Sequence, residues 1–128
     1  MDVSAVAASA DTVPRLLVEQ TRRHPRRVVF RHKYRGVWQP IDWQTYRDSA
    51  AAMTLGLESL GVGRGDRVAI HAENRPEWVY ADVANETLGA IVVGVYPTNP
   101  PAELMYLLQN SGSKVLVAED QEQVDKVL

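Results

Sequence analysis

The chain has 128 residues, with 14 lysines and arginines against 16 aspartates and glutamates, and it contains no cysteine. This length corresponds to one domain or part of one, and the near balance of charge excludes a global field that would attract nucleic acid or an anionic membrane. The lack of cysteine excludes disulfides, thiolate nucleophiles and zinc–thiolate sites. It also fits the reducing cytoplasm, where we expect the protein to be located.

The first residues predict a leader followed by a short helix. Residues 1–11 lack the positive region and the long apolar region of a secretory signal, and we interpret them as a flexible leader. Thr12 is a suitable N-cap for a helix with Pro14 in its first turn. His24-Pro25 ends this helix, because proline cannot continue it.

A hairpin and a longer helix are predicted next. Residues 28–33 and 37–39 flank a tight turn with glycine at position 36, which is the pattern of two antiparallel strands. Asp42 is a good N-cap, and the helix that it begins ends at Gly61. Apolar residues recur along this helix in steps of three and four, at Trp43, Tyr46, Ala50, Met53, Leu57 and Leu60.

The second half alternates strands and helices, which predicts parallel strands joined by helical crossovers. We therefore expect an α/β fold, an incomplete layered parallel sheet with flanking helices and an N-terminal β-hairpin beside it. The predicted elements are strand 67–72, a helix capped by Asn74 with Pro76 in its first turn, strand 89–95, a helix capped by Asn99 and ended by Gly112, strand 114–117, and a last helical segment over 120–128.

Two glycine-containing segments invite comparison with phosphate-binding loops. They are Gly61-Val62-Gly63-Arg64-Gly65 and the segment from Asn110 to Lys114. A phosphate loop must follow a strand and open a helix, whereas both segments follow a helix and lead into a strand. We interpret them as helix ends and turns, with Lys114 pointing to solvent. Within the first, Arg64-Gly65-Asp66 matches an adhesion tripeptide and is likewise interpreted as a turn.

The titratable residues show no catalytic or metal-binding pattern. His24, His32 and His71 lie on three separate elements, without the spacing of a ligand set. His71 ends a strand, where open α/β sheets bind ligands, and Glu73 is a candidate partner; the alternative is a hydrogen-bonded histidine at the rim of the sheet. The carboxylates Glu119, Asp120, Glu122 and Asp125 are interpreted as charges at the start of a helix.

Two further groups each leave two interpretations open. The basic run from Arg22 to Arg27 is either solvated surface or a contact for acidic lipid headgroups or a CoA phosphate. Trp38, Trp43 and Trp78 either line an acyl channel or serve the core, and the core is the favoured interpretation.

Several segments resemble a known family in both order and spacing. They are WQPIDWQTY (38–46), GLESLGVGRGDRVAI (56–70), NRPEW (74–78), GAIVVGVYPT (89–98) and ELMYLLQNS (103–111). The chain is similar to the opening segment of adenylate-forming (AMP-binding) acyl-CoA synthetases, of the long-chain fatty-acid–CoA ligase type. This resemblance implies that residues 12–128 are a partial N-terminal AMP-binding domain that ends before the ATP-binding motifs.

Members of that family activate a carboxylic acid with ATP as an acyl-adenylate, release pyrophosphate, and transfer the acyl group to CoA. Their phosphate loop, Thr-Glu motif, ribose-binding Asp and C-terminal Lys match no position here. The resemblance therefore assigns no catalytic, cofactor-binding or metal-binding residue to this chain. ATP, Mg²⁺ and CoA are implied for the complete family enzyme only, and we expect none of them to be bound by this chain alone.

Three functional hypotheses follow. The first is a fragment of a long-chain fatty-acid–CoA ligase that is inactive without its remainder, and the second is a non-catalytic assembly module that associates with an intact homologue or a separately encoded remainder. The third, a self-sufficient small ligand-binding domain, is disfavoured because no glycine loop follows a strand. Fatty acid is expected as a ligand only in a complete enzyme, nucleic acid is not expected as a partner, and membrane contact is at most peripheral.

The resemblance also implies a sheet that later sequence would complete. Ile91, Val92, Val93 and Val95 would then lie along an open edge. We therefore expect poor solubility of the isolated chain unless another polypeptide covers this edge.

Overall fold

The computed structural model describes residues 12–128. The predicted leader, residues 1–11, lies outside the described residues. The helices are α2 (Val13–Arg23), α3 (Trp43–Ser59), α4 (Pro76–Leu88), α5 (Pro101–Ser111) and α6 (Gln121–Asp125). The strands are β1 (Val28–Tyr34), β2 (Val37–Asp42), β3 (Arg67–His71), β4 (Ile91–Val95) and β5 (Val115–Ala118).

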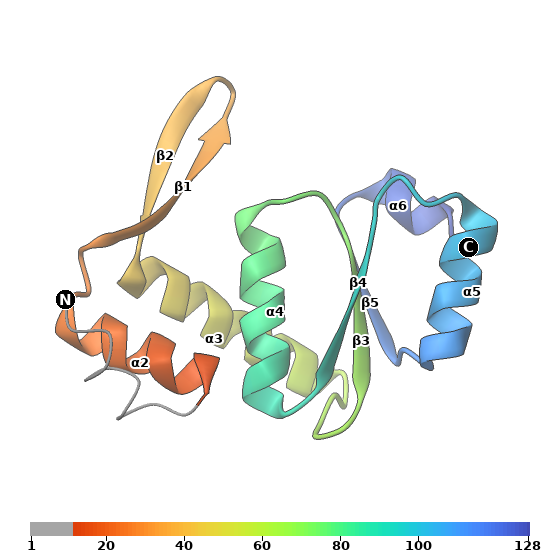
Figure 1. Ribbon diagram of the computed structural model, residues 1–128, viewed down its shortest axis with the longest axis horizontal. Coiled ribbons are helices and arrows are strands. Elements are labelled where there is room, and N and C mark those ends of the chain that lie inside the picture. The colour runs from red at the N-terminus through yellow and green to blue at the C-terminus, as the bar shows by residue number, and fades with distance from the viewer. Residues whose placement is uncertain (1–11) are drawn as a thin grey trace.

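The fold is a layered α/β arrangement around a parallel sheet of order β4-β3-β5 (Figure 1). The helices α3 and α4 cover one face of this sheet, α5 and α6 cover the other, and α2 packs outside α3 and α4. The chain passes from β3 to β4 through α4 and then crosses back over β3 to β5 through α5. Because crossovers keep one hand, this reversal of direction places α4 and α5 on opposite faces. The predicted fold class is confirmed.

The central strand β3 is the most deeply buried element. Val68, Ala69 and Ile70 are completely buried, as expected for an apolar strand with parallel neighbours on both sides. Its side chains alternate between the two faces. Val68 belongs to a core cluster with Leu57 of α3, while Ala69 belongs to a cluster on the α5 face.

The ends of the helices agree in part with the sequence prediction. Thr12 and Asp42 cap α2 and α3 by accepting from backbone N–H groups, and Gly112 ends α5 with a positive φ of 62°. The predicted caps at Asn74 and Asn99 are wrong. The N-cap positions lie one residue later, at Arg75 and Pro100, and neither side chain caps its helix. The proline that follows each of them removes one of the N–H groups that are left unpaired at the start of a helix.

The hairpin β1-β2 is confirmed, and it forms a sheet of its own that projects from the α2-α3-α4 side of the molecule (Figure 1). Arg35 and Gly36 form its two-residue turn, and both have a positive φ, at 49° and 80°. This is the backbone of a type I′ turn, which matches the twist of paired strands. Only the base of the hairpin enters the core, where Phe30 meets Tyr46 edge-to-face at 5.6 Å between ring centroids.

One position differs from the predicted apolar stripe of α3, and the last helix is shorter than the predicted segment 120–128. On α3, Tyr46, Ala50 and Leu57 are buried as predicted, but Leu60 is 63% exposed because the helix ends before it and the chain turns away at Gly61. At the C-terminal end, α6 stops at Asp125, and Leu128 lies outside it and is exposed.

Candidate functional site

The carboxyl ends of β3 and β5 lie side by side in the sheet, and the loop after β3 leads from this edge into α4. Ligands of open α/β sheets bind at this end of the strands. Two grooves meet here. One, of about 370 Å³, lies between the hairpin and α4, and the other, of about 340 Å³, lies between α3, α4 and β5. Arg75 and Trp78 line both grooves, so they define the candidate site.

An ion-pair network fixes Arg75. Its guanidinium donates to Glu119 at 2.7 Å and to Glu77 at 3.2 Å. The other carboxylate oxygen of Glu119 accepts the backbone N–H of Glu73 at 2.7 Å, which ties the loop after β3 to the end of β5. The hydrogen bond to Glu119 raises the pKa of the Arg75 guanidinium above its ordinary value, so this cation stays charged at all relevant pH values.

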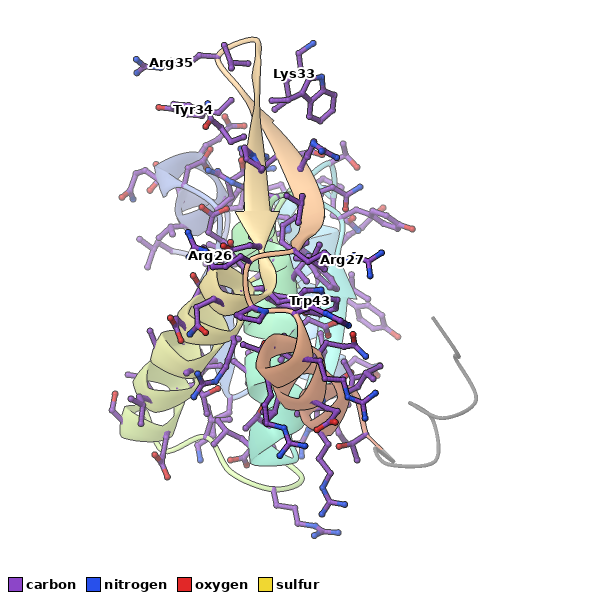
Figure 2. All side chains as sticks on the ribbon, turned by 90° about the vertical axis from the view of Figure 1, so that its left-hand side faces the viewer. Arg26, Arg27, Lys33, Tyr34, Arg35 and Trp43 are labelled. Carbon is purple, nitrogen blue, oxygen red and sulfur yellow. The ribbon has the colours of Figure 1, made fainter. Side chains whose placement is uncertain are left out.

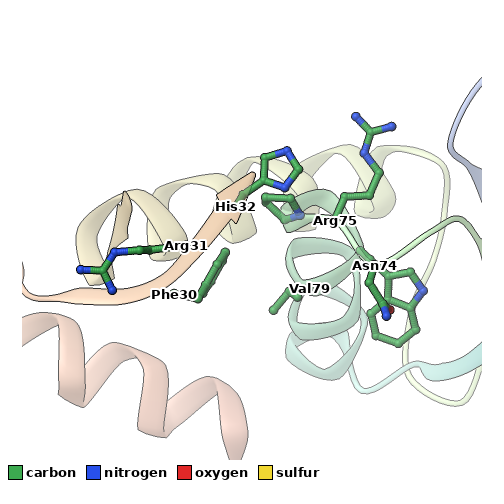
Figure 3. A pocket seen from close by; sticks show the side chains of 8 residues that line it. Phe30, Arg31, His32, Asn74, Arg75 and Val79 are labelled. Atoms are coloured by element: carbon green, nitrogen blue, oxygen red, sulfur yellow. The ribbon is translucent and has the colours of Figure 1, made fainter. Parts of the chain in front are cut away.

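The groove beside the hairpin is formed largely by side chains that lie over the start of α4. Figure 3 shows His32 next to the Arg75 side of the groove, Phe30 facing Val79, and Arg31 pointing away from it. Asn74 and Trp78 also line it. The lining is therefore mostly apolar, with a single fixed cation at its rim, and this composition suits binding of an amphipathic group better than bond-making chemistry.

The described residues contain no arrangement of a nucleophile with an adjacent base at this edge. Within residues 12–128, no group of three or more His, Asp or Glu side chains is placed to hold a metal ion. No helix in this described part is long and apolar enough to cross a membrane. The sequence assigned no catalytic, cofactor-binding or metal-binding residue, and that assignment stays a prediction.

The pairing of Arg75 with Glu119 was not predicted from the sequence. The signal that would have found them is positional: one follows β3 and the other follows β5, and carboxyl ends of adjacent parallel strands meet at one edge of a sheet. Their positions after these two strands, together with their opposite charges, predict that Arg75 and Glu119 form an ion pair. The interpretation of Glu119 as a charge at the start of a helix is wrong, whereas Asp120 does cap α6.

His71 ends β3 and is completely buried, and neither ring nitrogen has a hydrogen-bond partner in the structure. The interpretation as a hydrogen-bonded histidine is therefore wrong, and Glu73 does not pair with it. Alternation along β3 places His71 on the same face as Ala69, beneath α5 and α6 rather than in either groove. This side chain takes no part in the candidate site.

The two glycine-containing segments meet at the opposite end of β3, where they form a structural junction. The Asp66 carboxylate accepts the Gly63 N–H at 2.8 Å and the Lys114 ammonium at 3.0 Å, and the same ammonium donates to the Gly61 carbonyl. Both segments are turns, as predicted, but Lys114 is anchored rather than directed to solvent. The Gly63 N–H and then Lys114 hold the pKa of Asp66 below its ordinary value.

This lowered pKa predicts a pH dependence. Because the folded-state pKa of Asp66 lies below the value of 3.8 for a free side chain, its stabilisation is present above pH 3.8 and is lost as the pH falls through the folded-state pKa. We expect Asp66→Asn to lower stability at neutral pH and to flatten the fall in stability below pH 4. Urea unfolding at neutral and acid pH measures both effects, and the exposed Asp48→Asn is the control.

The remaining candidates are spread over the surface and the core. Trp38 is 60% exposed on the hairpin, so the core interpretation is wrong for it, whereas Trp43 packs against the cluster around Tyr46.

In the basic run, Arg22 and Arg23 pair with Glu19, and Arg26 pairs with Asp42. Three cations of this run are therefore paired within the fold, although Arg22 and Arg23 share one carboxylate.

A stability prediction follows from the network around Arg75. Glu119 is mostly buried and accepts two short hydrogen bonds, so Glu119→Ala should cost about 1–2 kcal/mol of unfolding free energy after allowance for solvent screening. Glu77→Ala removes an exposed ion pair and an acidic charge in the first turn of α4, both of them screened by solvent, and should cost less than Glu119→Ala. Equal losses in urea unfolding of the two variants would contradict the role given to Glu119.

The layered fold with an open parallel sheet places the chain among proteins with an adenylation-type N-terminal subdomain. It is similar to the N-terminal subdomain of Klebsiella oxytoca NpsA in complex with 3-hydroxybenzoyl-AMSN, with a TM-score of 0.75 and 26% identity over 84% of this chain and 26% of that one. A Mycobacterium tuberculosis fatty acyl CoA synthetase has the same fold, with a TM-score of 0.76 and 23% identity over 87% of this chain and 22% of that one.

The sequence matches the model of the AMP-binding enzyme family over residues 17–128, and the chain belongs to this family. It is 36% identical over 109 residues to the long-chain-fatty-acid–CoA ligase FadD15 of Mycobacterium bovis, a match that covers 85% of this chain and 18% of the ligase. It is also 38% identical over 89 residues to the uncharacterized protein Rv1549 of Mycobacterium tuberculosis, which covers 70% of this chain and 50% of that protein. The resemblance stated from the sequence is confirmed.

Proposed function

We propose that this chain forms the opening part of the large domain of a long-chain fatty-acid–CoA ligase. In this role it contributes to the conversion of ATP, fatty acid and CoA into acyl-CoA, AMP and pyrophosphate only together with sequence outside these 128 residues. The observation that carries the proposal is the match to FadD15 over 85% of this chain, in the same order of elements as the adenylation-type fold.

Two features of the fold support a scaffolding role for the chain in that reaction. Stabilising the transferred adenylyl group and the leaving pyrophosphate requires a cation, a phosphate-cradling loop and Mg²⁺. The glycine turns at 61–65 and 110–114 join helices to strands, and the Lys114 ammonium is bound to the Asp66 carboxylate. We therefore assign phosphate binding to neither turn. The groove at Arg75 instead offers an apolar wall with one fixed cation, which we assign to a supporting position beside the bound substrates.

The test is ATP–pyrophosphate exchange with Mg²⁺ and a long-chain fatty acid. The chain is assayed alone and mixed with a FadD15 polypeptide that lacks the part matched here. We expect exchange only in the mixture and co-purification of the two pieces. Exchange by the chain alone would overturn the assignment of catalysis to other sequence, and co-purification without exchange would favour the assembly role below. A chain with Val68→Asp, which places a charge in the fully buried strand β3, is the inactive control.

The alternative is a non-catalytic assembly module, and the open strand β4 favours it. This strand pairs with β3 on one side only, and Ile91 on it is 54% exposed. The Ile91 N–H donates to the backbone carbonyl of Asp66, which lies on the β3 side. Because successive N–H groups of a strand point to opposite sides, the N–H of Val92 points to the open edge. An unpaired edge of this kind accepts a strand from another chain.

The assembly role predicts that the chain elutes with intact FadD15 in size-exclusion chromatography. Val92→Pro removes an outward N–H while leaving the β3 pairing in place, so it should abolish co-elution with an unchanged circular dichroism spectrum. Co-elution that survives this substitution would place the contact elsewhere on the molecule.

A further inference from the structure

The hairpin β1-β2 carries a concentration of charge that the whole-chain balance hides. Residues 28–41 contain three cations, Arg31, Lys33 and Arg35, and no acidic residue, although the chain has a net charge of −2. Among residues 12–128, none of these three forms an ion pair with a carboxylate, in contrast to Arg22, Arg23 and Arg26. The hairpin therefore presents unneutralised positive charge on an otherwise balanced fold.

The same hairpin exposes large apolar and aromatic side chains. Tyr34, Val37 and Trp38 are 54%, 59% and 60% exposed, and all three lie at or next to the turn. Two of them lie beside the cations: the Lys33 ammonium is 5.8 Å from the centroid of the Trp38 ring, and the Arg35 guanidinium is 5.2 Å from that of Tyr34. We call this group the hairpin tip: Arg31, Lys33, Tyr34, Arg35, Val37 and Trp38.

The register of the strands distributes the hairpin tip over two faces. Tyr34 pairs with Val37 and Lys33 pairs with Trp38, and directly paired residues lie on the same face. Figure 2 shows Tyr34 and Arg35 on one side of the projecting hairpin and Lys33 on the other. Each face therefore carries one aromatic ring beside a cation, and alternation along β1 adds Arg31 to the Lys33 face. The tip stands clear of the helices on both sides.

We propose that the hairpin tip is a docking element for an anionic lipid surface. Tyrosine and tryptophan place an apolar ring with a polar edge at the boundary of a bilayer, while lysine and arginine reach the headgroups. A tip with apolar side chains on both faces fits a soft interface that surrounds it. This function is separate from the proposed ligase role and does not rest on it.

The placement of the rings favours a lipid surface over single-stranded RNA. RNA-binding sheets stack successive bases on aromatic side chains of one face. Here Tyr34 and Trp38 lie on opposite faces, so one strand of bases cannot stack on both. Val37 at the tip adds exposed apolar surface that contributes to insertion but offers nothing to a base.

The experiment is co-sedimentation of the 128-residue chain with two kinds of vesicle, phosphatidylcholine alone and phosphatidylcholine mixed with phosphatidylglycerol. We expect binding to the anionic vesicles only, and weakening with salt because the attraction is screened. Each cation near such a surface changes the affinity by about fivefold, so the triple variant Arg31→Gln, Lys33→Gln, Arg35→Asn should lose at least about tenfold. Asparagine is chosen at position 35 because it tolerates the positive φ there.

A matched control changes the net charge equally elsewhere, with Arg22→Gln, Arg47→Gln and Arg64→Gln. This control should retain binding, and circular dichroism should show both variants folded. Trp38→Ala should weaken binding without changing its salt dependence. Equal losses in the two triple variants would overturn the hairpin as the site. So would binding to poly(U) RNA without binding to anionic vesicles, or equal binding to both kinds of vesicle.

Discussion

Replacing Leu104 with alanine should lower the free energy of unfolding by about 3 kcal/mol. Leu104 is completely buried on the inner side of α5, where it packs with Ala69 of β3 and Val95 of β4. Alanine would leave a cavity between α5 and the sheet, and the pairing of β3 with β4 limits how far these strands can move to fill it. Urea unfolding of dilute protein, followed by tryptophan fluorescence, measures the shift in midpoint.

The neighbouring residue on α5 gives the control. Met105 is 37% exposed, so Met105→Ala removes a side chain of similar size from the same helix without opening a comparable cavity. Its cost should stay below about 1 kcal/mol, in the range of ordinary surface changes. Similar losses for the two variants would show that α5 does not pack on the sheet through Leu104.

The sequence predicts the elements of this fold because their signals are local. The spacing of Tyr46, Ala50 and Leu57 on α3, the glycine turn of the hairpin and the β-branched run of β4 each depend on residues close together in the chain. The order of elements then limits the topology to parallel strands with crossovers on two faces. This explains why the fold class could be predicted while individual contacts could not.

What the sequence missed depends on contacts between distant segments. Arg75 and Glu119 meet because β3 and β5 are neighbours, and Lys114 reaches Asp66 because two turns converge at the other end of the same strands. The exposure of Trp38 also depends on the tertiary arrangement, because no distant segment among the described residues covers it. A hydrophobic residue in a strand is expected to be buried, but the hairpin projects beyond the helices that would cover it. None of these outcomes has a signal in local spacing.

Replacing His71 with leucine should raise the free energy of unfolding by about 1–2 kcal/mol, because a buried polar group without a partner costs about that much. Its two ring nitrogens lie in a completely buried position at the end of β3 and make no hydrogen bond in the structure. Leucine is close in size and apolar, so it keeps the packing beneath α5 and α6 and removes the cost. The expected gain is unusual, since most core substitutions destabilise.

The exposed His24 supplies the comparison for this variant. His24→Leu, at the end of α2, should change stability by less than about 0.5 kcal/mol in the same urea titration. A loss of stability in His71→Leu would mean that the imidazole has a hydrogen-bond partner in solution, and that the fold needs a polar side chain at this position. A gain would mean that the folded chain tolerates the histidine rather than uses it. Because His71 lies outside both grooves, the gain should also leave exchange in the reconstituted mixture unchanged, which separates its packing role from the candidate site around Arg75.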